Sequence, residues 1–166
     1  MTAPVGSTTR APRTAATRTL VGLSAFLGLG AIGGGVTFLL DPSGGAAGLT
    51  VELLERAPVD SYLLPGLLLV LGFGVPASIL VAAILRPGDG PPRLRVLRWV
   101  EQRSRHRWAW LGSRLLGAVL MVWIVVQVLL IEFSWFQPLM LLIGAALVAL
   151  PASRGVRSDL RRGPRR

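Results

Sequence analysis

The stretch Leu63–Leu85, LLPGLLLVLGFGVPASILVAAIL, carries no charged side chain and decides the fold class. A membrane helix needs roughly 20 mostly apolar residues, because it must cross about 30 Å of hydrocarbon at about 1.5 Å per residue. A helix on the surface of a soluble bundle would instead need a polar stripe, and this stretch has only Ser78. The sequence therefore predicts a membrane-spanning helix here.

Three further apolar stretches surround it. Leu20–Leu40 carries no charge, Trp108–Ile131 contains only Arg114, and the shortest, Trp135–Pro151, has Pro138 in its first turn, where a missing N–H costs little. Only 16% of the 166 residues are charged, whereas a soluble domain carries about 25%. The predicted fold class is all-α: a polytopic membrane protein with four transmembrane helices in an up-down bundle.

The distribution of arginine predicts the orientation of these helices. All 18 basic residues are arginine. Three lie in residues 1–19, seven between the second and third apolar stretches and six in residues 152–166, whereas the loop after the first stretch has only Arg56 and the last hairpin has none. Loops rich in arginine stay in the cytoplasm. We therefore expect a multi-pass protein of the plasma (inner) membrane with both termini in the cytoplasm.

The same reasoning divides the chain into a membrane domain, residues 20–151, between two tails. We expect residues 1–19 to form a disordered cytoplasmic tail and residues 152–166 a basic cytoplasmic tail. The alternative for the first apolar stretch is a cleaved signal peptide, but the stretch is longer than a signal-peptide core, so an uncleaved helix is favoured. The alternative for residues 1–19 is an organelle transit peptide, but they show no strong amphipathic pattern, so a disordered tail is favoured.

The middle loop contains a second predicted element. Over Leu94–Trp108, Val96, Leu97 and Val100 fall on one helix face and arginines on the other. This pattern is typical of a short helix lying on the inner leaflet, where its arginines attract anionic phospholipids. Nucleic acid is the less favoured ligand for the same arginines, since topology alone explains a basic inner loop.

Several kinds of chemistry are excluded by composition. The chain has no cysteine and one histidine, His106, which excludes disulfides, thiol catalysis and a self-contained Cys/His zinc site. No Walker A, metalloprotease or nucleophile-elbow motif occurs. We expect no cofactor, no metal and no catalytic residue. A membrane enzyme is the remaining alternative, and it would require the acids of the loop after the first helix to meet: Asp41, Glu52, Glu55 and Asp60.

Four polar positions in or beside the spans are candidate functional residues: Arg114, Gln127, Glu132 and Gln137. Arg114 lies about 9 Å past Trp108, so we expect its side chain to snorkel to the cytoplasmic interface, the alternative being a buried structural or substrate-binding role. The other three could line an outward-facing vestibule. Hydrogen bonding between helices is the favoured interpretation.

Small residues predict a helix-packing face on the first helix. Ser24, Gly28, Ala31 and Gly35 recur at spacings of four, three and four, which places them on one stripe. The pairs Gly30/Gly34 and Ser113/Gly117 have the same small-residue spacing. In the second helix, Pro76 lies near the middle and predicts a local break in the helical hydrogen bonds.

Several motifs resemble those of a group of small four-helix membrane proteins of high-GC actinobacteria. They are Asp60–Leu67 (DSYLLPGL), Trp108–Trp110 (WAW), Trp123–Gln127 and Gln137–Pro138, so the resemblance covers about Leu20–Pro151. A composition rich in alanine and glycine, with arginine in place of lysine, fits that coding bias. The resemblance implies architecture and compartment, and it carries no mechanism.

The sequence leaves two functional classes in competition. The first is a non-enzymatic accessory or scaffold protein of the cell membrane, which acts through helix packing and lipid contact. The alternative is a small oligomeric transporter or channel, suggested by the Pro76 break, Arg114 and Gln127. Expected partners are anionic phospholipids at the cytoplasmic face and another membrane protein or a second copy of the chain; nucleic acid is not expected.

Overall fold

The computed structural model describes residues 13–55, 57–85, 108–130 and 134–161, and these residues form helices and turns without any strand. The predicted all-α fold is therefore confirmed. The long helical segments are α1 (Ala15–Leu40), the continuous run of α2 (Leu63–Leu68), π-helical η3 (Leu69–Gly74) and α3 (Val75–Leu85), then α5 (Trp108–Leu130) and α6 (Phe136–Ala149). The short ones are η1 (Gly45–Ala47), η2 (Val51–Leu54), η4 (Leu150–Ala152) and α7 (Arg154–Arg161).

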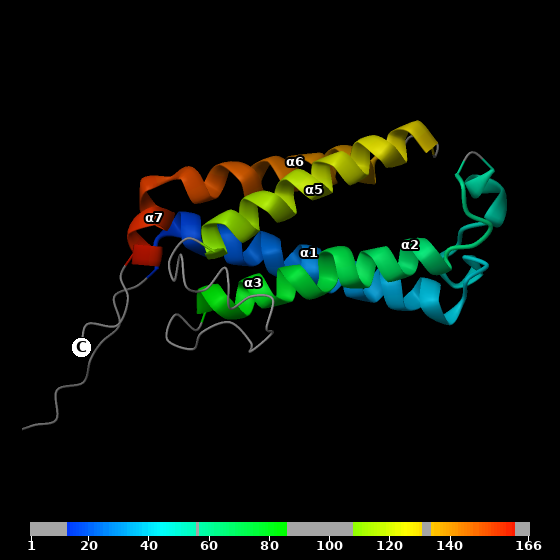
Figure 1. Cartoon of the computed structure of the whole chain (residues 1–166), viewed down its shortest axis with the longest axis horizontal. Helices are drawn as coiled ribbons and strands as arrows, with labels where there is room; N and C mark the ends of the chain where they lie inside the picture. Colours follow the sequence, from blue (N-terminus) through cyan, green and yellow to red (C-terminus); the bar gives the residue numbers. More distant parts are fainter. Residues whose placement is uncertain (1–12, 56, 86–107, 131–133, 162–166) are drawn as a thin grey trace, which may run out of the picture.

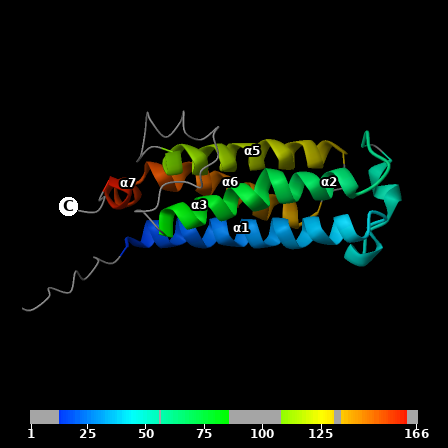
Figure 2. The ribbon, with the colours of Figure 1, turned by 60° about the horizontal axis from the view of Figure 1, so that its bottom comes forward.

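The long segments form two helical hairpins, visible in both views (Figures 1 and 2). In one, α1 lies along α2, η3 and α3; in the other, α5 lies along α6. The hairpins join because α3 packs against α5 and α1 packs against α6. Figure 1 shows the second hairpin diverging from α1 and α2 toward the end that carries residues 41–62.

The bundle has two chemically different ends. The start of α1, the end of α3, the start of α5 and α7 share one end, here called the α7 end; residues 41–62 lie at the other, the loop end (Figure 1). Within the described ranges every arginine belongs to a segment near the α7 end: Arg13, Arg18, Arg114, Arg154, Arg157 and Arg161. Four of the five acids described belong to the loop end: Asp41, Glu52, Glu55 and Asp60.

The first helix begins earlier than its apolar residues indicate. Thr14 is the N-cap residue of α1, so helical structure starts at Ala15, five residues before the predicted boundary at Leu20. Residues 15–19 thus belong to the bundle, whereas the prediction assigned them to the disordered tail. The apolar pattern marks only the membrane-compatible part of a helix, because hydropathy does not register the polar first turn that precedes it.

The expected break near Pro76 is a π-helical segment. Pro76 has no backbone N–H, and in the turn ahead of it Val75 donates to the carbonyl of Val70, five residues back. The helix continues on both sides, so Leu63–Leu85 forms one continuous segment in which the irregular geometry is confined to its centre.

Glycines determine how closely the helices of each hairpin approach. A Cβ on Gly35 of α1 would lie 2.5 Å from Cγ2 of Val70 and 2.7 Å from the carbonyl oxygen of Gly66. In the second hairpin, a Cβ on Gly117 of α5 would lie 2.5 Å from the carbonyl oxygen of Gly144 on α6. Backbone meets backbone at both places, which only glycine allows.

Apolar side chains fill the interior and also cover the outside. Leu20, Phe73 and Leu147 are buried members of one core that includes residues of both hairpins. Phe73 and Trp123 join the hairpins, with ring centroids 6.2 Å apart. Large apolar side chains are nevertheless exposed on every long helix, among them Leu29, Leu71, Leu129 and Leu142. Such a surface is unfavourable in water and suits lipid.

Three helices are long and apolar enough to cross a membrane: Ala15–Leu40, Leu63–Leu85 and Ala109–Leu130. They suggest a membrane protein. The fourth apolar helix, Phe136–Ala152, is shorter than the length that identifies a span on its own. The basic helix predicted over Leu94–Trp108 falls, except for its last residue, outside the described residues.

Candidate functional site

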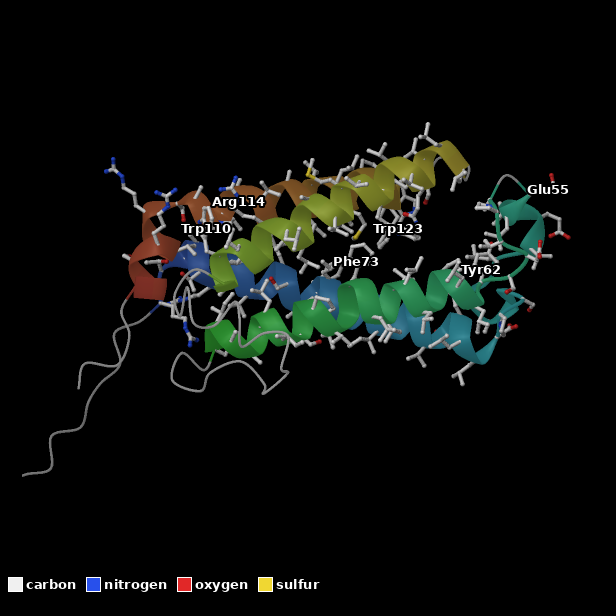
Figure 3. The ribbon with its side chains drawn as sticks, in the orientation of Figure 1. Glu55, Tyr62, Phe73, Trp110, Arg114 and Trp123 are labelled. Atoms are coloured by element: carbon white, nitrogen blue, oxygen red, sulfur yellow. The ribbon has the colours of Figure 1, made fainter. Side chains whose placement is uncertain are left out.

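Arg114 is the one charged residue of α5, and it lies against Trp110, one turn earlier. The guanidinium carbon is 4.7 Å from the centroid of the indole ring, within the range of a cation–π contact. The indole N–H in turn donates a 2.9 Å hydrogen bond to the carbonyl oxygen of Pro151 in η4. Figure 3 shows both side chains near the α7 end. Arg114 therefore points back toward that end, the direction the snorkelling prediction requires, as helical side chains generally do.

The α7 end also contains a junction between α1 and α7, the first and last of the described helices. Oδ2 of Asp159 in α7 accepts hydrogen bonds of 2.8 Å from the backbone N–H of Thr14, 2.8 Å from its hydroxyl and 2.7 Å from the hydroxyl of Thr17. These groups form the first turn of α1, where N–H groups lack intrahelical acceptors. A carboxylate is favoured there by both hydrogen bonding and the helix dipole.

Arg13 connects the end of α3 to the same junction. Its guanidinium donates to the carbonyl oxygens of Ile84 at 3.2 Å and Leu85 at 2.8 Å, the last residues of α3. The last carbonyls of a helix have no intrahelical donor and carry partial negative charge, so an arginine stabilises them. Residues 13–17 therefore connect α1, α3 and α7.

The hydroxyl groups within the apolar helices bond inside their own helices. Ser24 donates to Leu20, Thr37 to Gly33 and Ser78 to Gly74, each to the carbonyl four residues back. Ser113 donates to the carbonyl of Trp110 at 3.1 Å. Throughout the described ranges no buried side-chain nitrogen or oxygen lacks a partner. These helices thus present no row of unsatisfied polar groups to a ligand.

The candidate polar residues near the loop end lie in different surroundings. Gln137 is buried in the first turn of α6, where its Oε1 accepts a 3.2 Å hydrogen bond from the N–H of Ser134. That contact is local, like a helix cap. Gln127 is half-buried on α5. Glu132 lies outside the described residues, so the predicted grouping of the three stays a prediction.

The predicted packing residues Ser24, Gly28, Ala31 and Gly35 are all buried on α1. Gly28 faces Ala77 and Gly74, and Gly35 faces Gly66 and Val70. The pair Gly30/Gly34 behaves differently: a Cβ on Gly30 would meet nothing within 4 Å, and one on Gly34 only Leu69 at 4.0 Å. Spacing alone did not distinguish the face that meets a neighbour from the one that does not.

The loop end is organised around Tyr62. Its ring stacks on Phe38, with centroids 4.9 Å apart, and its hydroxyl donates to the carbonyl of Thr50 at 2.9 Å. Gly44, with φ of 85°, lies so close that a Cβ there would be 2.7 Å from the ring. Burial, and then the charge of Glu52, raises the pKa of the Tyr62 hydroxyl. Figure 3 shows Tyr62 where the loop meets α2.

The acids of this end do not form a common site. Asp41 accepts from the hydroxyl and N–H of Ser43 and from the N–H of Ala46, which lowers the pKa of its carboxyl. Hydrogen bonding to Thr50, followed by its own backbone N–H, lowers the pKa of Glu52. Among the residues searched, which are those the structure describes, no three of His, Asp and Glu could hold a metal ion. The meeting of four acids that the enzyme alternative requires is not found.

The junction at the α7 end was not predicted from the sequence. Thr14 and Thr17 precede an apolar run, which is a recognisable N-cap signal. Their acceptor lies 145 and 142 residues away, and no local pattern gives such a pairing. α7, whose Val156 is fully buried, lies within residues 152–166, for which the sequence predicts only a basic tail.

Comparisons with family models, with curated proteins and with solved structures found no match. The resemblance to small four-helix membrane proteins of actinobacteria therefore stays a prediction.

Proposed function

We propose that this chain is an integral protein of the plasma (inner) membrane of a bacterial cell, crosses the membrane four times with both termini in the cytoplasm, and acts as a non-enzymatic accessory or scaffold protein. In this role the protein holds a fixed arrangement of helices and contacts lipid or another membrane protein.

Four crossings are supported by the second hairpin. α6 is paired with α5 through the backbone contact of Gly117 and Gly144, and α5 is long enough to span. A helix held alongside a spanning helix lies at the same depth. Phe136–Ala152 covers about 25 Å at 1.5 Å per residue, slightly less than the hydrocarbon thickness. Bilayer thinning and flanking residues such as Trp135 and Arg154 compensate for such a mismatch.

The orientation is supported by the charges at the two ends. Among the described residues, the arginines lie at the α7 end and four of the five acids at the loop end, in a bundle whose sides are apolar. The positive-inside rule assigns the α7 end to the cytoplasm, and with it both tails and the middle loop.

The scaffold activity is supported by one observation above all: small residues serve close helix contacts, and polar groups in the helices are satisfied locally. Gly35 and Gly117 bring backbones together, while Ser24, Thr37 and Ser78 bond within their own helices. A transport path needs polar groups that face a common space and exchange partners with a solute. The described helices offer tight packing in place of such groups.

A flux assay tests this proposal. The purified chain is reconstituted into liposomes that hold pH-sensitive and halide-sensitive dyes, beside liposomes without protein. We expect ion and proton flux to equal that of the protein-free liposomes. Flux above that level which Gln127→Leu or Arg114→Leu abolishes would reject the scaffold activity.

The second candidate, a small oligomeric transporter or channel, is favoured by the π-helical segment η3. Segments of this kind recur at functional sites, and η3 lies halfway along the second helix beside Pro76. Pro76→Ala restores the missing N–H. If the chain is a transporter, this variant should change a measurable flux; if it is a scaffold, the variant should alter only stability.

A further inference from the structure

Arg114 carries a positive charge that no carboxylate among the described residues neutralises. It is the one charge in a helix of 23 residues, about 9 Å beyond Trp108, and it contacts an aromatic ring without any carboxylate partner in the described part of the chain. Taking a cation out of water is costly unless an anion accompanies it. Arg114 is half-buried and has no anion beside it among the described residues, so its N–H donors can take an anion from outside them.

Trp110 holds the guanidinium of Arg114 in position, and so determines where an anion can bind it. Its indole is held by the hydrogen bond to the Pro151 carbonyl, so the ring cannot rotate freely. The ring face then holds the guanidinium of Arg114. A guanidinium whose central carbon lies over an aromatic ring still has N–H donors for a bidentate acceptor. Carboxylate and phosphate both suit these donors, and phosphate is the one that the headgroups of a lipid leaflet supply.

Two further arginines follow Pro151 closely. Arg154 begins α7 three residues later, and Arg157 lies one turn beyond; both side chains are exposed. α7 is itself anchored, since Val156 is fully buried and Asp159 holds the first turn of α1. The positive charges are therefore carried on a fixed element at the same end of the bundle as Arg114 (Figure 3).

We propose that Arg114, Arg154 and Arg157 bind the phosphate headgroup of an anionic phospholipid, with Trp110 holding Arg114 in position. This inference rests on the proposed membrane function and names its lipid partner. The guanidinium of Arg114 points toward the α7 end, which the proposed topology places at the cytoplasmic leaflet, and basic pockets between membrane helices on the cytoplasmic side recognise anionic headgroups in this way. A free phosphate ion would lack the acyl chains that the exposed leucines beside the site, Leu111 and Leu115, are placed to contact.

Lipid retention tests the site directly. The full-length chain is purified in detergent, and native mass spectrometry measures the bound fraction at increasing phosphatidylglycerol and, separately, phosphatidylcholine. We expect the wild type to retain phosphatidylglycerol preferentially. Arg114→Gln should weaken its apparent affinity by about tenfold, the loss of one charge-assisted contact, and Arg154→Gln with Arg157→Gln should weaken it further. Arg114→Lys keeps the charge without the planar stack and should fall between.

Two controls separate the site from general charge and from misfolding. Arg10→Gln removes the same charge from the segment ahead of α1 and should retain phosphatidylglycerol like the wild type. Thermal unfolding followed by circular dichroism identifies any variant that has lost its fold. For a folded Arg114→Gln variant, retention equal to the wild type would overturn the proposal. So would equal retention of the two lipids by the wild type, or displacement of phosphatidylglycerol by excess inorganic phosphate, which would indicate a free-phosphate site.

This measurement is made in detergent and does not depend on which side of a membrane the site occupies. Failure of the lipid site and failure of the four-span topology are therefore distinguishable. Lipid retention without the predicted topology would support the lipid site and contradict the four-span proposal. The predicted topology without lipid retention would contradict only the lipid site.

Discussion

Oδ2 of Asp159 accepts a 2.8 Å hydrogen bond from the backbone N–H of Thr14, so a residue of the last described helix caps the first one. The same oxygen accepts from the hydroxyls of Thr14 and Thr17, and the Thr17 side chain is buried. The two ends of the described chain are thereby joined at the α7 end. This pairing closes the bundle independently of the glycine contacts within each hairpin.

We expect Asp159→Ala to lower the free energy of unfolding by about 1–3 kcal/mol, because it removes the acceptor of the Thr14 N–H and of the Thr14 and Thr17 hydroxyls. Asp159→Asn keeps an acceptor oxygen and should cost less. Titration with sodium dodecyl sulfate, followed by circular dichroism, measures both. Asp60→Ala removes an exposed acid at the loop end and serves as the control. Asp159→Ala as stable as the control would show that the cap contributes nothing.

A second prediction compares two glycines of α1. Gly35→Ala places a methyl group 2.5 Å from Val70 and should destabilise the first hairpin by about 1–3 kcal/mol. Gly30→Ala meets nothing within 4 Å and should stabilise by about 0.5–1 kcal/mol, since alanine is the better helix former. The same denaturation assay distinguishes them. If both variants change stability in the same direction, close packing at Gly35 is not what stabilises the hairpin.

The second hairpin gives an equivalent pair. Gly117→Ala would set its methyl group 2.5 Å from the Gly144 carbonyl oxygen, whereas Gly112→Ala would meet only Leu80, at 4.0 Å. We expect Gly117→Ala to separate α5 from α6 and to lower the thermal midpoint in detergent, and Gly112→Ala to leave it unchanged or higher. A Gly117→Ala midpoint at or above the wild-type value would show that the two helices do not need this contact.

The hydroxyl of Tyr62 provides a test of the loop end. Tyr62→Phe keeps the ring stacked on Phe38 but removes the hydrogen bond to Thr50, at a cost of about 1 kcal/mol. Tyr62→Ala also removes the stack and the surface under Gly44, and should loosen residues 41–62 much more. Trypsin cleavage after Arg56, the one arginine of this loop, reports the opening. The expected order of cleavage rates is wild type, Tyr62→Phe, Tyr62→Ala, and a reversed order would contradict the account.

The turn at Asp41 should respond to acid. Hydrogen bonds from Ser43, and then from Ala46, hold the pKa of this carboxyl below its ordinary value of 3.8. A lowered pKa means that the contribution of the charged form is present above pH 3.8 and is lost as the pH falls through the lower, folded-state pKa. The amide NMR signal of Ala46 should therefore move with a midpoint below 3.8, and Asp41→Asn should abolish the movement. A midpoint at or above 3.8 would show that these hydrogen bonds do not favour the charged carboxylate.

Local sequence patterns predicted the long helices. They could not predict contacts between residues far apart in the sequence. The apolar run Leu63–Leu85 has the same bounds as the helical segment, so composition alone located it. The start of α1 at Ala15 lies ahead of the apolar run, in a polar first turn that hydropathy does not register, and its contact with Asp159 spans 145 residues. Small-residue spacing could not separate Gly35 from Gly30, since the difference lies in which neighbouring helix each one faces. The contact of Trp110 with Pro151 likewise depends on tertiary structure.

The central claim is that the short helix α6 crosses the membrane and that both termini are cytoplasmic. The chain has no cysteine, so single cysteines can be labelled without background. Ser134→Cys and Ala152→Cys place one exposed thiol at each end of α6 and η4. With a membrane-impermeant maleimide on intact cells, the account predicts labelling at position 134 at once and at position 152 only after permeabilisation. Labelling of both from the same side, or the reverse order, would contradict it.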